Sequence, residues 1–169
     1  IGALVIRKNI PILPLQWGGG QEQYLRPGTV PIPLVIGMTK AAELAFDTLH
    51  SRQKLLCSLR NKLWTDLKRQ IPDLILNGSM KFRLPNNLNF TVPGVRGSQL
   101  QHSLRSRLNC SSASACSNGA PSHVLQSIGR TVEEAEASLR LSLGRHTTTS
   151  DIKRAVKIIT KVVTDLRVS

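Results

Sequence analysis

The amino-acid sequence predicts an α/β fold: a small domain with helices packed on a small sheet over residues 37–169, preceded over residues 1–36 by the tail of another domain. Apolar residues recur at helical spacing in two long stretches, 38–71 and 152–166, and helical and strand-like stretches follow one another between them. Residues 1–36 contain five of the nine prolines and three consecutive glycines, a composition that favours extended structure over an independent core.

The composition is that of a folded, strongly basic protein. Hydrophobic residues make up 40% of the 169 residues, and no apolar run is long enough to span a bilayer, so we expect no membrane association and a cytoplasmic location. Twenty-three Lys and Arg against ten Asp and Glu give a net charge of +13, which favours acidic proteins, nucleic acid or phosphorylated ligands as partners. Aromatic residues, at 4%, do not alternate with basic ones, so direct nucleic-acid binding is not expected and a solvated basic face is the simplest interpretation.

The first element expected is a strand at Ile1–Arg7, an apolar run with no turn or cap before it. Because a buried strand needs a partner and the sequence has no initiator Met, we expect that residues upstream are missing and that this chain is a fragment or a cleaved product. A helical pattern follows from Met38 to Ile71 and is ended by Pro72, which predicts one long amphipathic helix or two in sequence.

Short strands are predicted between the helices. Residues 74–76 and 88–92 form two of them, the first closed by an Asn-Gly turn and the second ended by Pro-Gly. Small residues from 109 to 115 indicate a tightly packed strand that runs into a flexible loop. Residues 138–143 alternate between polar residues and leucines, which places Arg140 on the face opposite the leucines, where an arginine indicates a bound anion.

Further helices are predicted in the second half of the chain. Residues 98–108 have leucines at helical spacing, and Pro121 suits the first turn of a helix that Gly129 ends. Thr131 followed by Glu134 is a capping-box signature for another short helix. The clearest helix is the last, whose apolar stripe consists of Ile152, Ala155, Val156, Ile159, Val162, Val163 and Leu166.

The three cysteines, Cys57, Cys110 and Cys116, have neither the number nor the spacing of a disulfide framework or a metal motif, so we expect a reducing compartment and no metal site. Cys57 and Cys110 are expected to be buried, inert thiols. Cys116 lies in a loop of small residues and is either an incidental loop cysteine or a nucleophile, because reactivity depends on thiolate formation. Arg140 and Arg145 likewise form either an anion site or structural ion pairs.

Five short motifs lie in register along the chain. They are Gly18-Gly19-Gly20-Gln21-Glu22, Arg26-Pro27-Gly28-Thr29, Leu84-Pro85-Asn86-Asn87-Leu88-Asn89, Ser112-Ala113-Ser114-Ala115-Cys116 and the run from Leu139 to Thr148. Each motif alone is weakly specific, but together their order and spacing resemble the cysteine desulfurases, a family of class V aminotransferase-like enzymes. The resemblance implies the small C-terminal domain of a pyridoxal-phosphate-dependent transferase of fold type I, preceded by the end of the large cofactor-binding domain.

The resemblance also implies a chemistry. Pyridoxal 5'-phosphate is the expected cofactor and L-cysteine the substrate; Cys116 takes the sulfur as a persulfide and L-alanine is released. Arg140 resembles the family's arginine that binds the substrate α-carboxylate, and Thr29 resembles the threonine that reaches the cofactor phosphate of the neighbouring subunit of a homodimer. The sulfur then passes to a sulfur-acceptor protein or iron-sulfur scaffold, for iron-sulfur cluster or thio-cofactor and tRNA biosynthesis. Arg145 resembles a secondary, more structural arginine.

The sequence also departs from the family pattern. The family's cofactor lysine lies just upstream of the segment that matches Ile1–Arg7, so the chain is expected to lack it and to be inactive in isolation. The segment between Cys116 and Pro121 is shorter than in long-loop desulfurases, and Ala113 replaces their usual glycine. Both departures weaken the expectation that Cys116 can reach an iron-sulfur scaffold protein.

Two alternatives stay open from the sequence. One is a non-catalytic module whose basic surface binds an acidic protein or RNA, a possibility that the expected lack of the lysine strengthens. The other is a related selenocysteine or cystine lyase of the same fold. Salt-dependent RNA binding would identify the first alternative. Comparing turnover on cysteine, selenocysteine and cystine would identify the second.

Overall fold

The computed structural model describes residues 1–112 and 121–168. Spatial contacts divide the chain into two compact units, Ile1–Leu49 and His50–Ser169. The first unit ends at Leu49, which is the first residue of the second of two consecutive long helices.

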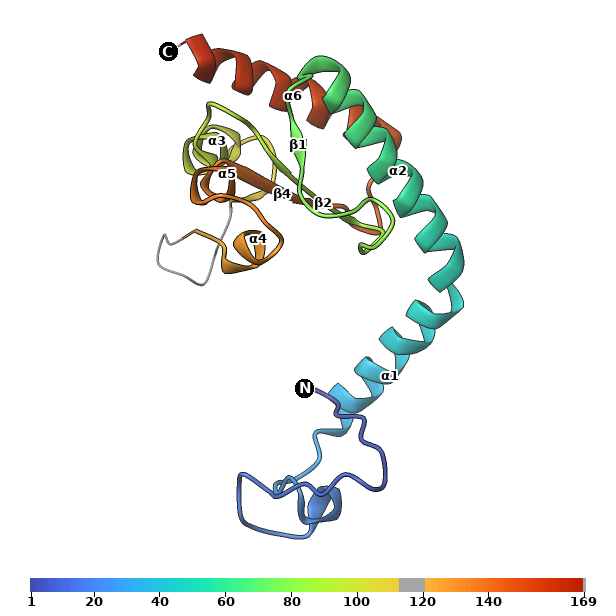
Figure 1. The fold of residues 1–169 in the computed structure, drawn as a ribbon. Coiled ribbons are helices and arrows are strands. Elements are labelled where there is room, and N and C mark those ends of the chain that lie inside the picture. The colour runs from blue at the N-terminus through green and yellow to red at the C-terminus, as the bar shows by residue number, and fades with distance from the viewer. Residues whose placement is uncertain (113–120, 169) are drawn as a thin grey trace. The chain divides into compact units, whose positions relative to one another are not determined.

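The first unit contains one long helix and little other regular structure (Figure 1). Helix α1 spans Ile32–Asp47, with Pro31 as its N-cap and Pro33 in the first turn, where the missing N–H of proline removes no helical hydrogen bond. A short 3-10 helix, η1, spans Gln21–Tyr24. The strand predicted at Ile1–Arg7 is wrong: a strand is stabilised by pairing, and none of the residues that the structure describes pairs with this run.

Helix α2 spans Leu49–Gln70 and begins shortly after α1 ends, so the helical pattern from 38 to 71 forms two helices in sequence. The leucines predicted to carry its apolar face are buried, namely Leu56, Leu59, Leu63 and Leu67. The domain boundary predicted after residue 36 falls inside α1, and the assignment of residues 1–36 to a large cofactor-binding domain stays a prediction.

The second unit is built on a four-stranded antiparallel sheet of order β1-β2-β4-β3. The strands are β1 (Ile75–Leu76), β2 (Asn87–Thr91), β3 (Ser111–Ser112) and β4 (Ser138–Ser142). The prediction of helices packed on a small sheet is confirmed, and the antiparallel pairing means that the helices cover the sheet without forming parallel crossover units.

The described residues of this unit contain four more helices: α3 (Gly97–Leu104), α4 (His123–Ser127), α5 (Val132–Glu136) and α6 (Thr149–Val168). The predicted capping box is confirmed at α5, where Thr131 and Glu134 exchange hydrogen bonds of 3.2 and 3.1 Å with each other's backbone N–H. Pro121 does not lie in the first turn of α4, because Ser122 is the N-cap and its hydroxyl accepts from Leu125 N.

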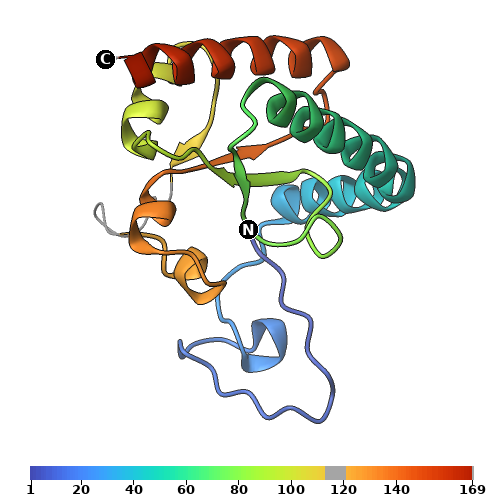
Figure 2. The ribbon, with the colours of Figure 1, turned by 45° about the horizontal axis from the view of Figure 1, so that its top comes forward.

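One face of the sheet carries the hydrophobic core. Leu88, Phe90, Leu139 and Leu141 are at most 5% exposed, and apolar residues of α2, α3 and α6 pack against them in a single cluster. Figure 2 shows α6 on one side of the strands and α4 and α5 on the other. The other face of β2 and β4 is polar, and it contains the candidate site.

Candidate functional site

Arg140 lies in the middle of β4, a strand with a neighbour on each side. Asn89 of β2 and Ser111 of β3 are its direct partners in register, so the backbone beneath Arg140 is fixed from both sides. Its side chain is exposed, and Nη2 donates to Ser111 Oγ at 3.4 Å. Because Leu139 and Leu141 are buried in the core, the alternation predicted for this strand is confirmed.

The guanidinium of Arg140 is not neutralised by any residue that the structure describes. Among the residues that the structure describes, neither Arg140 nor Arg145 forms an ion pair with a carboxylate. Structural ion pairs, the alternative for these two arginines, are therefore not observed in the part of the chain that the structure describes. An exposed planar fork of donors on a rigid strand can bind an external carboxylate with two parallel hydrogen bonds.

A buried polar network lies beside Arg140 on the same face. Asn77, 3% exposed, donates through Nδ2 to Asn89 Oδ1 at 2.7 Å and to Ser138 Oγ at 2.9 Å. Thr91 Oγ1 donates to Asn77 Oδ1 at 3.1 Å, and Ser138 Oγ donates to the carbonyl of Glu134 at 2.7 Å. Since the buried polar atoms of the network find partners, it holds this face rigid beside the exposed arginine.

Thr29 lies in the first unit, in the loop before α1. Its side chain is exposed and, within the described part of the chain, makes no hydrogen bond. Gly28 before it has a φ of +114°, a backbone conformation that glycine adopts without steric cost. The first turn of α1, three residues further on, has no side-chain cap, but Pro33 lacks an N–H and the N–H groups of Leu34 and Val35 donate to the carbonyl of Pro31. The exposed hydroxyl of Thr29, rather than the helix N-terminus, is therefore what this segment offers to an anion.

Cys116, the predicted sulfur acceptor, lies outside the described residues, as does Ala113. The last residues described before it are Ser111 and Ser112 of β3, which pair with Arg140 and Leu139. The segment that carries Cys116 therefore starts beside the candidate arginine.

The other two cysteines are free thiols, each half-buried. Cys110 packs against the core, and its burial raises the pKa of the Cys110 thiol, which disfavours the reactive thiolate. The prediction that Cys110 is inert fits this environment. Both thiols are less deeply buried than predicted.

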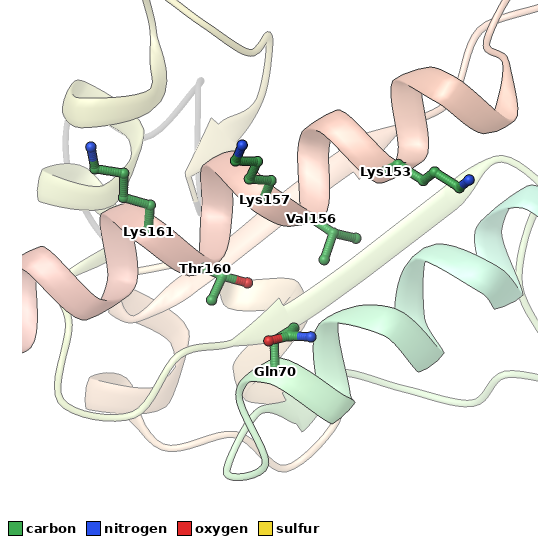
Figure 3. Close-up of a pocket in the computed structure, with 6 residues that line it drawn as sticks. All are labelled: Gln70, Lys153, Val156, Lys157, Thr160 and Lys161. Carbon is green, nitrogen blue, oxygen red and sulfur yellow. The ribbon is translucent and has the colours of Figure 1, made fainter.

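A shallow hollow lies between the end of α2 and α6, on the helices that cover the leucine face of the sheet. Figure 3 shows the residues that line it, which are Gln70, Lys153, Val156, Lys157, Thr160 and Lys161. The three lysines recur every four residues and so share one face of α6. None of the predicted site residues lines this hollow, and Arg140 lies on the opposite face of the sheet.

The structure brings Arg140 together with residues that the sequence analysis did not single out, Asn77 and Asn89. A signal for Asn89 was present, because it alternates with the buried apolar residues of its strand and so belongs to the polar face. Asn77 had no such signal, since an asparagine before glycine is explained by the turn alone. Thr29 lies in the other unit.

Comparison with known proteins defines the family. The sequence profile of the aminotransferase class-V family matches residues 1–155. The chain therefore belongs to the aminotransferase class-V family.

Individual relatives are more specific. The chain is 39% identical over 175 residues to a mitosomal cysteine desulfurase of Trachipleistophora hominis, covering 99% of this chain and 40% of that protein. It is also 39% identical over 170 residues to the cysteine desulfurase IscS of Dictyoglomus turgidum, covering 99% of this chain and 43% of that protein. The chain thus spans about 40% of the length of these relatives.

Solved structures agree on the fold. A NifS-like protein superposes with a TM-score of 0.83 at 31% identity, over 95% of this chain and 41% of that one. A NifS-like protein from Rickettsia africae gives a TM-score of 0.78 at 27% identity, over 91% of this chain and 41% of that one.

Within the described residues, no helix has the length and apolar character needed to cross a membrane.

Proposed function

We propose that this chain is the C-terminal part of a cysteine desulfurase. In the proposed reaction the Cys116 thiolate attacks the sulfur of L-cysteine, an S–S bond forms, and the C–S bond of the substrate breaks. The carbon that loses sulfur takes up a proton, so L-cysteine and the Cys116 thiol yield L-alanine and a Cys116 persulfide. The desulfurase relatives, similar over nearly the whole chain, support this reaction.

The observation that carries the proposal is the position of Arg140. A side chain that binds the α-carboxylate has to be charged, accessible and held still, and Arg140 is exposed, unpaired with any described carboxylate, and mounted on a strand paired on both sides. Its role would be to orient L-cysteine so that the thiol of the substrate faces the attacking cysteine.

Connectivity permits Cys116 to act at the same place. Cys116 follows Ser112 by four residues, and four residues of extended chain span at most about 14 Å. Since β3 pairs with β4 next to Arg140, the acceptor thiol can reach a substrate held there. A loop position also suits a residue that must later deliver sulfur to an outside acceptor.

The exposed hydroxyl of Thr29 fits the phosphate of pyridoxal 5'-phosphate, because a hydroxyl that makes no hydrogen bond within the described residues can donate to a phosphate oxygen. When bound, this cofactor would supply the electron sink for breaking the C–S bond. We propose that Thr29 binds the phosphate in the neighbouring subunit of a homodimer, and that the cofactor lysine comes from sequence preceding residue 1.

Sulfur would pass from Cys116 to an acceptor protein, such as an iron-sulfur scaffold.

The free thiols of Cys57 and Cys110 are consistent with a reducing compartment such as the cytoplasm.

The test uses the full-length protein that contains this chain. Supplied with L-cysteine, cofactor and a reductant, it should release L-alanine and sulfide, and Cys116→Ala should abolish turnover, whereas Cys110→Ala and Cys57→Ala should keep it. Full activity in Cys116→Ala would refute the assignment of the acceptor. Higher turnover on selenocysteine or cystine than on cysteine would instead indicate a related lyase.

A further inference from the structure

Arg140 is one member of a polar row that crosses the whole sheet. Asn77, which follows β1, donates its backbone N–H to the carbonyl of Asn89 at 3.0 Å, Asn89 pairs with Arg140, and Arg140 pairs with Ser111. Side chains directly opposite on neighbouring antiparallel strands have Cβ atoms about 4.5–5.5 Å apart. Asn89 is therefore the side chain next to Arg140 on β2, on the face that we propose binds the substrate.

The amide of Asn77 is surrounded by hydrogen-bond partners. An amide nitrogen has two protons, and Asn77 donates one to Asn89 Oδ1 and the other to Ser138 Oγ. The single proton of Ser138 goes to the carbonyl of Glu134, so Ser138 can act toward Asn77 as an acceptor. Thr91 Oγ1 lies 2.9 Å from Ser138 Oγ and 3.1 Å from the carbonyl oxygen of Glu134, so both hydroxyls take part in the network around the buried Asn77.

The hydrogen bond from Asn77 orients the amide of Asn89 in the structure. Its oxygen accepts from Asn77, and because the oxygen and nitrogen diverge from one carbon, its nitrogen is turned away from Asn77. Asn89 Nδ2 makes no hydrogen bond to any residue that the structure describes, and the side chain is half-buried. The structure thus places an amide nitrogen, whose two N–H donors are unused among the described residues, at the strand position next to Arg140.

A carboxylate matches this pair of side chains. Its two oxygens offer about four lone-pair sites, more than one guanidinium fork occupies. Arg140 supplies the positive charge and Asn89 a neutral donor that is already ordered, so little conformational entropy is lost when it binds. We propose, on the basis of the proposed function, that Asn89 is a second substrate-binding residue and donates from Nδ2 to the α-carboxylate of L-cysteine.

The experiment compares two variants of the full-length protein that both take an acceptor from Asn77, and Ser138→Ala damages the network more, because it also removes the hydrogen bond to the carbonyl of Glu134. Asn89→Ala and Ser138→Ala each remove one acceptor of Asn77 Nδ2, but Asn89→Ala alone also removes the outward amide nitrogen. Because hydrogen bonds to charged groups are stronger than neutral ones, Asn89→Ala should raise KM for L-cysteine about tenfold or more with kcat little changed. Ser138→Ala should keep KM within about twofold of the unmodified protein, since it leaves the donor in place.

A second variant covers the case in which Asn89→Ala does not fold. Asn89→Thr keeps a hydroxyl that can accept from Asn77 and suits a strand, yet lacks the amide nitrogen, so KM should rise here too. The rise should be smaller for L-cysteinamide, whose neutral amide replaces the carboxylate. An unchanged KM in a folded Asn89→Ala or Asn89→Thr protein, or an equal rise in Ser138→Ala, overturns the inference.

Failure of the proposed function gives a different result. If Arg140→Ala leaves KM unchanged, or the unmodified protein does not consume L-cysteine, the proposed carboxylate site or reaction itself is wrong. If Arg140→Ala raises KM and Asn89→Ala does not, the desulfurase proposal stands and the role of Asn89 alone is refuted.

Discussion

Gly97, the first residue of α3, is the position where one added methyl group should do most damage. A Cβ built there would lie 2.6 Å from the carbonyl oxygens of both Glu136 and Ser138. Those oxygens belong to the end of α5 and the start of β4, and the residue between them, Ala137, accepts a backbone hydrogen bond from Val92 at 2.9 Å. Backbone held in this way cannot move aside as a flexible side chain could.

The cost of Gly97→Ala follows from this overlap. Each oxygen would sit about 0.8 Å inside the 3.4 Å at which ordinary contact begins, and overpacking of this kind costs about 1–3 kcal/mol. With two backbone oxygens involved, we expect the upper end, about 3 kcal/mol. Alanine gains at most about 1 kcal/mol over glycine in a helix, so the net loss in the free energy of unfolding is about 2 kcal/mol.

Urea unfolding followed by circular dichroism measures this loss. At an m-value of about 2 kcal/mol/M, the midpoint should fall by about 1 M with m unchanged. Gly37→Ala is the matched control: it lies inside α1 with no atom within 4 Å of the added Cβ, and should raise stability by up to about 1 kcal/mol. If Gly97→Ala were as stable as the unmodified protein, the packing argument would be refuted.

Two further predictions concern local interactions. Thr131→Ala removes the capping hydroxyl of α5 and should lower the free energy of unfolding by about 1 kcal/mol in urea titrations; no change would contradict it. The hydrogen bond from Arg167 holds the pKa of Asp73 below its usual range, so the pair stabilises the fold above pH about 4 and this contribution disappears as pH falls through the lowered pKa. Arg167→Ala should therefore cost up to about 1 kcal/mol near neutral pH and less in acid, whereas a pH-independent cost would show that the ion pair contributes nothing.

Local patterns in the sequence were sufficient to predict most helices and strands of the second unit. The capping box at Thr131 and Glu134, the alternation in β4 and the apolar stripe of α6 each depend on residues within a few positions of one another, and the structure confirms them. The direction of the Arg140 side chain followed from the same alternation, because successive side chains of a strand point to opposite faces.

Features that depend on distant residues were not predictable in the same way. The run Ile1–Arg7 has the composition of a strand, but composition does not supply a partner strand, and in the described residues it has none. The contact between Asn77 and Asn89 depends on the register of β1 against β2, and that between Asn77 and Ser138 spans 61 positions. Register is set by the packing of the whole sheet, which a local pattern does not contain.

The same register explains how the core controls the candidate site. If β4 slipped by one residue against β2, the buried leucines would move to the polar face and Arg140 would enter the core. Exposing Leu139 or Leu141 would cost about 1.5–3 kcal/mol each, and burying an unpaired guanidinium would cost more. The energy that keeps Arg140 and Asn89 facing outward as neighbours thus comes from the opposite face of the sheet. Substitutions in that core should therefore disturb the proposed carboxylate site.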